Sequence, residues 1–128
     1  MERAVPILPV TDLRLAHAFY VEALGFSVRF THSEDETTGL LGVARGGLCL
    51  TLDCPMTGHG REACVALEVH DADALYAEWH VQVPVLRAPH DEAWGARTFD
   101  LLDPFGNTLF VIGPPSGAST AAPVSGVA

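Results

Sequence analysis

The feature that most constrains the fold is an order of elements that occurs twice. Val10-Thr11-Asp12 superposes on Val69-His70-Asp71, an offset of 59 residues. After each aspartate, which is a good helix N-cap, apolar residues recur at helical spacing, and a strand and a hairpin follow. The 128 residues suffice for one domain with a real core. We therefore predict an α+β fold, with two βαβββ modules at about residues 4–54 and 63–113 in a single domain of residues 1–113.

Alternating and helical apolar patterns place the elements of the first module. Gly25 is expected to end the helix, and Gly46-Gly47 is typical of a hairpin turn. Residues 31–38 are polar, with an acidic run at 34–36, and are expected to form a solvated loop. The predicted strands are residues 4–10, 26–30, 40–44 and 48–53, and the predicted helix is residues 13–24.

The second module is expected to repeat this order. Its hairpin turn, Asp103-Pro104-Phe105-Gly106-Asn107, combines a proline that presets φ with residues that tolerate positive φ. The predicted strands are residues 63–69, 81–86, 94–102 and 109–112, the helix begins after Asp71, and residues 89–93 are expected to be a loop. Residues 114–128 are rich in small residues, which predicts a flexible tail.

The amino-acid composition restricts the classes of function that the chain can have. The net charge is −9, with seven arginines and no lysine, which argues against nucleic acid and favours cationic small molecules. No apolar run is long enough for a membrane span, and no signal peptide is recognisable. Three cysteines without a CxxC pair fit free thiols in a reducing compartment. The expectation is a soluble, cytoplasmic protein without membrane or nucleic-acid partners.

Several motifs together make the chain similar to the glyoxalase / bleomycin resistance protein / extradiol dioxygenase superfamily, also called vicinal oxygen chelate. The resemblance covers residues 4 to about 113 and implies paired βαβββ modules that form a cup-shaped mixed sheet, usually in a homodimer. The residues that carry it are Val10-Thr11-Asp12-Leu13, Phe19-Tyr20, Leu24-Gly25-Phe26, Leu75-Tyr76-Ala77-Glu78-Trp79, Trp94-Gly95 and Asp103-Pro104-Phe105-Gly106-Asn107.

Enzymes of this superfamily hold a divalent metal with His, Gln or Glu from three strands. By the resemblance, those positions correspond here to Val5, Cys64 and Phe110. Valine and phenylalanine cannot coordinate a metal, and Cys64 alone cannot supply the three or so protein ligands that such a site needs. We therefore expect no metal, no other cofactor and no catalytic residue.

The departure from the metal pattern favours the bleomycin resistance branch, whose members sequester a flat, cationic drug without changing it. Stacking requires aromatic faces, and the drug's cationic tail requires negative charge. Phe30 and Trp94 match aromatic cleft positions of that branch, whereas a second cleft tryptophan would fall at about Ala66. The residues expected to contact the ligand are Phe30, Asp53, Ala66, Trp94, Phe99 and Phe110.

Two alternatives stay open at this point. The first is a metal-dependent lyase, isomerase or dioxygenase of the same superfamily with atypical ligands. The second is a small-molecule-binding module of unknown role. A carboxylate pair for acid–base chemistry is available in Glu68 and Asp100, but the sequence does not say whether they meet.

Overall fold

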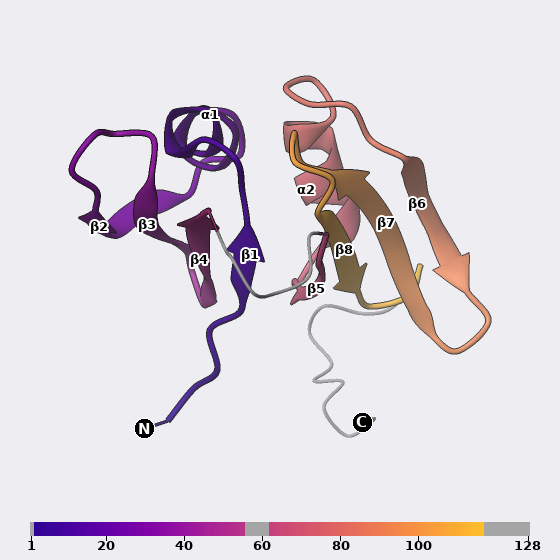
Figure 1. Ribbon diagram of the computed structural model, residues 1–128. Coiled ribbons are helices and arrows are strands. Elements are labelled where there is room, and N and C mark those ends of the chain that lie inside the picture. Colours follow the sequence, from indigo (N-terminus) through magenta and orange to yellow (C-terminus); the bar gives the residue numbers. More distant parts are fainter. Residues whose placement is uncertain (1, 56–61, 117–128) are drawn as a thin grey trace. The chain divides into compact units, whose positions relative to one another are not determined.

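Two four-stranded mixed sheets with the same strand order are present in the computed structural model, which describes residues 2–55 and 62–116 (Figure 1). The first sheet has the order β1-β4-β3-β2 and the second the order β5-β8-β7-β6. In each half of the chain, a strand and a helix precede three further strands. This repeated βαβββ order confirms the predicted α+β fold class.

The chain divides into two compact units, residues 1–65 with 102–108 and residues 66–101 with 109–128. The turn of the last hairpin thus groups with the first unit, although most of both hairpin strands lies in the second. The predicted tail falls largely outside the described residues. Within the part that is described, the backbone N–H of Ser116 donates to Oδ1 of Asp91 at 3.0 Å.

The first unit contains a parallel pair, β1 with β4, and two antiparallel pairs, β4 with β3 and β3 with β2. Its core lies between the sheet and the helical segment, where Leu50, Leu52 and Val43 meet Ala16 and Tyr20, all at most 1% exposed. Its elements are β1 (Ile7–Pro9), α1 (Leu13–His17), the π-helical segment η1 (Ala18–Ala23), β2 (Ser27–His32), β3 (Gly39–Arg45) and β4 (Leu48–Cys54).

The second unit has the same organisation, with α2 packed against its sheet. Trp79 of α2 makes an edge-to-face contact with Phe99, and both side chains are fully buried with Leu109 and Val111. The strand β5 (Cys64–Glu68) begins before the boundary between the units. The other elements are α2 (Ala72–Trp79), β6 (Arg87–Glu92), β7 (Ala96–Leu102) and β8 (Thr108–Gly113).

Both predicted helix caps are confirmed. The carboxylate of Asp12 accepts hydrogen bonds from the backbone N–H groups of Arg14 and Leu15, and that of Asp71 accepts one from Ala74. Each cap satisfies donors that the first turn of a helix leaves unpaired. The predicted hairpin turn is also present between β7 and β8, with Gly106 at a φ of 89°.

Five predicted elements differ from the structure in their position or type. Residues 81–86 form turns, bends and irregular backbone after α2 and not a strand, whereas residues 87–92, which overlap the predicted loop at 89–93, form the edge strand β6. The strand at 4–10 shortens to Ile7–Pro9, and β2 extends through His32 into the expected loop. The helix at 13–24 is α-helical for five residues and then π-helical, a change in hydrogen bonding that apolar spacing does not reveal.

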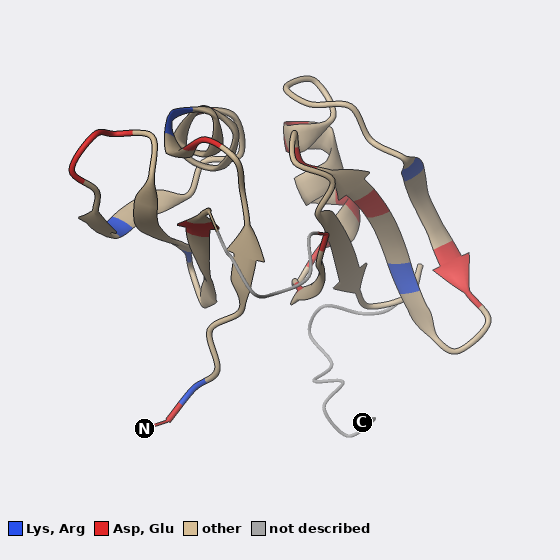
Figure 2. Ribbon diagram, in the orientation of Figure 1, with Lys and Arg blue, Asp and Glu red and all other residues tan. Residues whose placement is uncertain are grey.

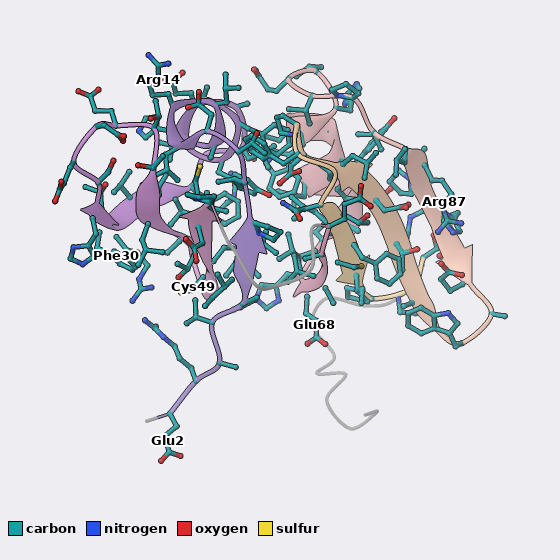
Figure 3. The ribbon with its side chains drawn as sticks, viewed as in Figure 1. Glu2, Arg14, Phe30, Cys49, Glu68 and Arg87 are labelled. Carbon is teal, nitrogen blue, oxygen red and sulfur yellow. The ribbon has the colours of Figure 1, made fainter. Side chains whose placement is uncertain are left out.

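Successive strand residues point to opposite faces of a sheet, so each sheet has a face toward its helix and one away from it. We call the second the distal face. In Figure 3, Phe30 and Cys49 point away from α1, whereas Arg14 extends from that helix. No helix among residues 2–55 and 62–116 has the length and apolar character needed to cross a membrane.

Candidate functional site

The strand register places four side-chain positions in one row across the distal face of the first sheet. Phe30 of β2 pairs with Gly42 of β3, Gly42 with Thr51 of β4, and Thr51 with Ile7 of β1. The residues between them along the strands, such as Leu41 and Leu52, are buried toward the helix. The row is therefore a continuous strip of sheet surface that begins at an aromatic ring.

The ring of Phe30 lies directly over Gly42. A Cβ placed on Gly42 would overlap the edge of that ring, so the ring occupies the space of a missing side chain. The imidazole of His32 lies 5.5 Å from the same ring, and the guanidinium carbon of Arg29 lies 5.8 Å from its centroid. Phe30 is thus fixed flat on the sheet and half exposed, as a stacking platform requires.

A second row on this face contains the predicted carboxylate. Asp53 of β4 lies between Leu40 of β3 and Pro9 of β1, and Leu40 pairs in turn with His32 of β2. Asp53 is half buried and lies two strands from Phe30 and two residues further along the strands, which corresponds to about 12 Å at the usual spacings. The distal face of the first sheet therefore carries an aromatic ring and a carboxylate on different strands.

In the second unit, two of the predicted ligand residues lie on the distal face. Phe110 of β8 is half exposed between the fully buried Leu109 and Val111, and Ala66 of β5 is exposed beside the buried Leu67. Phe99 points the other way. It is fully buried among the rings of α2, where its side chain has no exposed surface for a ligand.

A connected polar cluster on β6 and β7 was not anticipated. Oε2 of Glu92 accepts a hydrogen bond from the Thr98 hydroxyl at 2.7 Å and lies 3.1 Å from Nε2 of His90. Arg87 contributes a 3.1 Å bond from Nε to Oδ1 of Asp100 and approaches Glu92 at 3.9 Å. The Thr98 hydrogen bond, followed by the charges of His90 and Arg87, lowers the pKa of Glu92.

This cluster lies on the distal face of the second sheet. Its neighbours along β7, Arg97 and Phe99, point toward α2, where Nε of Arg97 lies 2.7 Å from Oδ2 of Asp73. Thr98 and Asp100 alternate with them and so point away. Sequence reasoning missed the cluster because it took residues 89–93 as a loop. Correct pairing of His90 with Thr98 would have revealed it.

Trp94 lies in the turn between β6 and β7, where Gly95 has a φ of 98°. Its side chain is 62% exposed, which is unusual for the largest apolar residue. The turn is closed by a hydrogen bond from the N–H of Gly95 to the carbonyl of Glu92 at 3.0 Å. The backbone of the turn that carries Trp94 is therefore held, and most of the indole surface is available.

The three positions that match metal ligands by resemblance differ in environment. Cys64 is exposed on β5, Phe110 is half exposed on β8, and Val5 precedes β1. In the described part of the chain, no group of three or more His, Cys, Asp or Glu residues is arranged to hold a metal ion. Glu68 and Asp100 both lie on the distal face of the second sheet, on strands separated by β8.

Comparison with known proteins identifies the family. Residues 1–113 match the model of a family described as glyoxalase superfamily protein, so the chain belongs to the glyoxalase superfamily. Among curated proteins, no match was found.

Solved structures with this fold include drug-binding proteins. A bleomycin-binding protein complexed with bleomycin is 25% identical, with 88% of this chain and 98% of that chain covered and a TM-score of 0.71. An antibiotic-binding protein, TnmS3 from Streptomyces sp. CB03234, is 28% identical, with 89% and 97% covered and a TM-score of 0.71. Lactoylglutathione lyase from Agrobacterium tumefaciens, at 19% identity, 88% and 94% coverage and a TM-score of 0.71, shares the fold.

Proposed function

We propose that this chain binds and sequesters a planar, cationic small molecule or antibiotic of the bleomycin type, without chemical conversion, and thereby confers resistance. The observation that carries this proposal is the position of the Phe30 ring, which lies over Gly42 at the start of the row of side-chain positions across the distal face. Such a ring, half exposed and already immobilised, gives a ligand a stacking surface at little cost in conformational entropy.

Negative charge supports the cationic character of the ligand. Asp53 lies on the same face as Phe30, and Glu68 and Asp100 lie on the distal face of the second sheet. The whole chain carries a net charge of −9, which attracts cations over a longer range (Figure 2). The ligand contacts proposed for the second unit are Ala66, Phe110 and the exposed Trp94.

The solved structures add independent support. Two proteins that are 25% and 28% identical to this chain over nearly their whole length bind bleomycin and an antibiotic, respectively. Absence of catalysis is favoured by side-chain chemistry. Val5 and Phe110, at two of the three positions where relatives hold a metal, have no donor atom. We further propose that the protein is a cytoplasmic homodimer that uses no cofactor.

Calorimetric titration with metal-free bleomycin tests the proposal. The wild-type chain is expected to bind the drug saturably, while Phe30→Ala weakens binding about tenfold through loss of the stacking surface. Val28→Ala, which removes another exposed apolar side chain from β2, is the matched control. No saturable binding would contradict the proposal, as would a stoichiometric metal in the purified protein by elemental analysis.

A further inference from the structure

A pocket of about 490 Å³ lies on the opposite side of the first sheet from Phe30. It is formed by α1, η1 and the loop that joins β2 to β3. The two sheet residues that line it, Thr31 and Leu41, are register partners on adjacent strands and face the helix. We call it the helix-side pocket. Its position separates it from the distal-face row described above.

The volume of the helix-side pocket and its buried apolar lining suit a small molecule. Its volume falls within the range of roughly 300–1,000 Å³ that is usual for ligand sites. Leu13 of α1 and Leu41 of β3 line it and are 4% and 5% exposed, so they belong to the core and present a small, fixed apolar surface to the pocket. Polar side chains supply the rest of the lining, on both the helical segment and the loop.

The helical segment contributes one carboxylate to this lining. Oε2 of Glu22 lies 3.5 Å from Nδ1 of His17, five residues earlier in the chain. In a regular α-helix, residues five apart do not face each other. The π-helical hydrogen bonds of η1, such as that from the N–H of Leu24 to the carbonyl of Phe19, bring positions five apart closer together.

The loop contributes a second carboxylate. Glu36 has a φ of 68°, a left-handed conformation that is uncommon for a residue other than glycine. Two side chains hold the loop in this form. The Ser33 hydroxyl oxygen accepts from the N–H of Glu36, and Asp35 accepts from the N–H groups of Thr37 and Thr38. Figure 2 shows this acidic loop in red, between β2 and β3.

The loop is also attached to the helix at the pocket's edge. The N–H of Leu13 donates to the carbonyl of Thr37 at 2.9 Å. The same leucine lines the pocket, so the backbone of the loop that carries Glu36 is held in a fixed relation to the apolar surface. Such a pre-formed arrangement lowers the entropy cost of binding.

The charges that line the pocket do not balance. Arg14 lies 3.8 Å from the Asp12 carboxylate, and Glu22 lies beside His17. The Glu36 carboxylate makes no hydrogen bond or ion pair to any residue that the structure describes. The lining contains two carboxylates and one guanidinium, so its formal charge is negative when His17 is neutral.

We propose that the helix-side pocket binds a small organic cation, with an ammonium group on a compact branched apolar body. The ammonium group donates to the carboxylates of Glu36 and Glu22, and the apolar body packs on Leu13 and Leu41. Charge-assisted hydrogen bonds supply orientation, and the leucines supply burial. This site is independent of the drug-binding face and is expected to fill without affecting it.

Titration of the full chain with isopentylammonium, followed by backbone amide NMR, tests the proposal. Saturable shifts are expected at Leu13, Glu36 and Leu41, and isopentanol, which has the same apolar body without the charge, is expected to bind at least about tenfold more weakly. Absence of saturation, or equal binding of the alcohol, would overturn the proposal.

Matched charge variants separate a specific site from general attraction of cations. Glu36→Gln is expected to weaken isopentylammonium binding about tenfold, and Glu34→Gln, which removes the same charge from the same loop outside the pocket, to leave it nearly unchanged. Glu22→Gln gives a second pocket variant on a different element. Equal weakening by Glu34→Gln and the pocket variants would mean long-range attraction only and would overturn the proposal. Thermal unfolding verifies that each variant is folded.

Discussion

The hydroxyl of Tyr20 donates a hydrogen bond to Oδ2 of Asp103 at 2.7 Å, across 83 residues of sequence. Both side chains are buried, at 0% and 5% exposure. Oδ1 of Asp103 accepts from the N–H groups of Phe105 and Asn107, and the Asn107 amide donates to the Pro9 carbonyl. The last hairpin turn is therefore joined to η1 and β1 by a buried polar network within the first unit.

Tyr20→Phe is expected to lower the free energy of unfolding by about 2 kcal/mol, because it removes a hydrogen bond to a buried carboxylate while keeping the ring. Urea unfolding at pH 7 measures this loss. Tyr76→Phe is the matched control, since no hydrogen bond from its hydroxyl is found within the described residues. Equal stability of the two variants would contradict the role assigned to the Tyr20 hydroxyl.

The buried hydroxyl of Tyr20 is also expected to make the folded protein less stable at alkaline pH. Burial, followed by the charge and hydrogen bond of Asp103, raises the pKa of Tyr20 above its ordinary value of 10.0. A raised pKa in the folded state contributes stability that is complete below that ordinary value and is lost as the pH rises above it. The difference in unfolding free energy between wild type and Tyr20→Phe is therefore expected to shrink above about pH 10. A constant difference in urea unfolding from pH 8 to about 11.5 would refute this linkage.

Local signals in the sequence predicted much of the fold. Asp12 and Asp71 were placed as helix caps because a cap depends on adjacent backbone donors. The Asp103–Asn107 turn was also predicted from a local signal, the φ preferences of its proline, glycine and asparagine. Its long-range partner Tyr20 was not, because a hydrogen bond across 83 residues leaves no periodic signal. Phe30 was predicted as an aromatic ligand residue. The position of its ring over Gly42 could not be predicted, because it depends on the register of β2 and β3.

The errors around β6 have a physical cause. An edge strand has a single neighbour and need not be apolar, so Pro89 and charged residues are tolerated there. Residues 81–86 show the opposite error, because their apolar residues predict a strand that does not form. Val81 and Leu86 are apolar but 68% and 54% exposed, and Val83, at 7%, is buried. The spacing of apolar residues indicates on which face of an element each one lies. It does not show whether another part of the chain packs over that face.

The acidic loop is expected to lose its order in acid. Hydrogen bonds from the N–H groups of Thr38 and then Thr37 lower the pKa of Asp35 to about 2. A lowered pKa in the folded state stabilises the loop above the ordinary value of 3.8, and that contribution is lost as the pH falls toward 2. Amide exchange at Thr37 and Thr38 is expected to accelerate over this range. A carboxyl titration of Asp35 centred at its ordinary pKa would contradict this.

Gly42→Ala is expected to displace the Phe30 ring, because the new Cβ would overlap it. The expected cost is about 1–3 kcal/mol in unfolding free energy, as for other overpacked sites. Drug binding is expected to weaken as it does in Phe30→Ala. Gly47→Ala, where a Cβ meets no atom within 4 Å, is the matched control. Unchanged bleomycin affinity in Gly42→Ala would remove the ring from the proposed site.

Trp94→Ala is expected to weaken bleomycin binding about tenfold, since stacking and burial of an exposed indole are lost. Stability is expected to stay within about 0.5 kcal/mol, because the side chain is 62% exposed. Val81→Ala, which trims another exposed apolar residue of the second unit, is the control.

Fluorescence tests the same contact directly. The chain has two tryptophans, and Trp79 is fully buried. Quenching of the wild-type emission by the drug is therefore expected to come from Trp94 and to disappear in Trp94→Ala. Unchanged affinity, or quenching that persists in the variant, would exclude Trp94 from the ligand contacts. Phe30 and the carboxylate of Asp53 would then remain as the proposed contacts of the first unit.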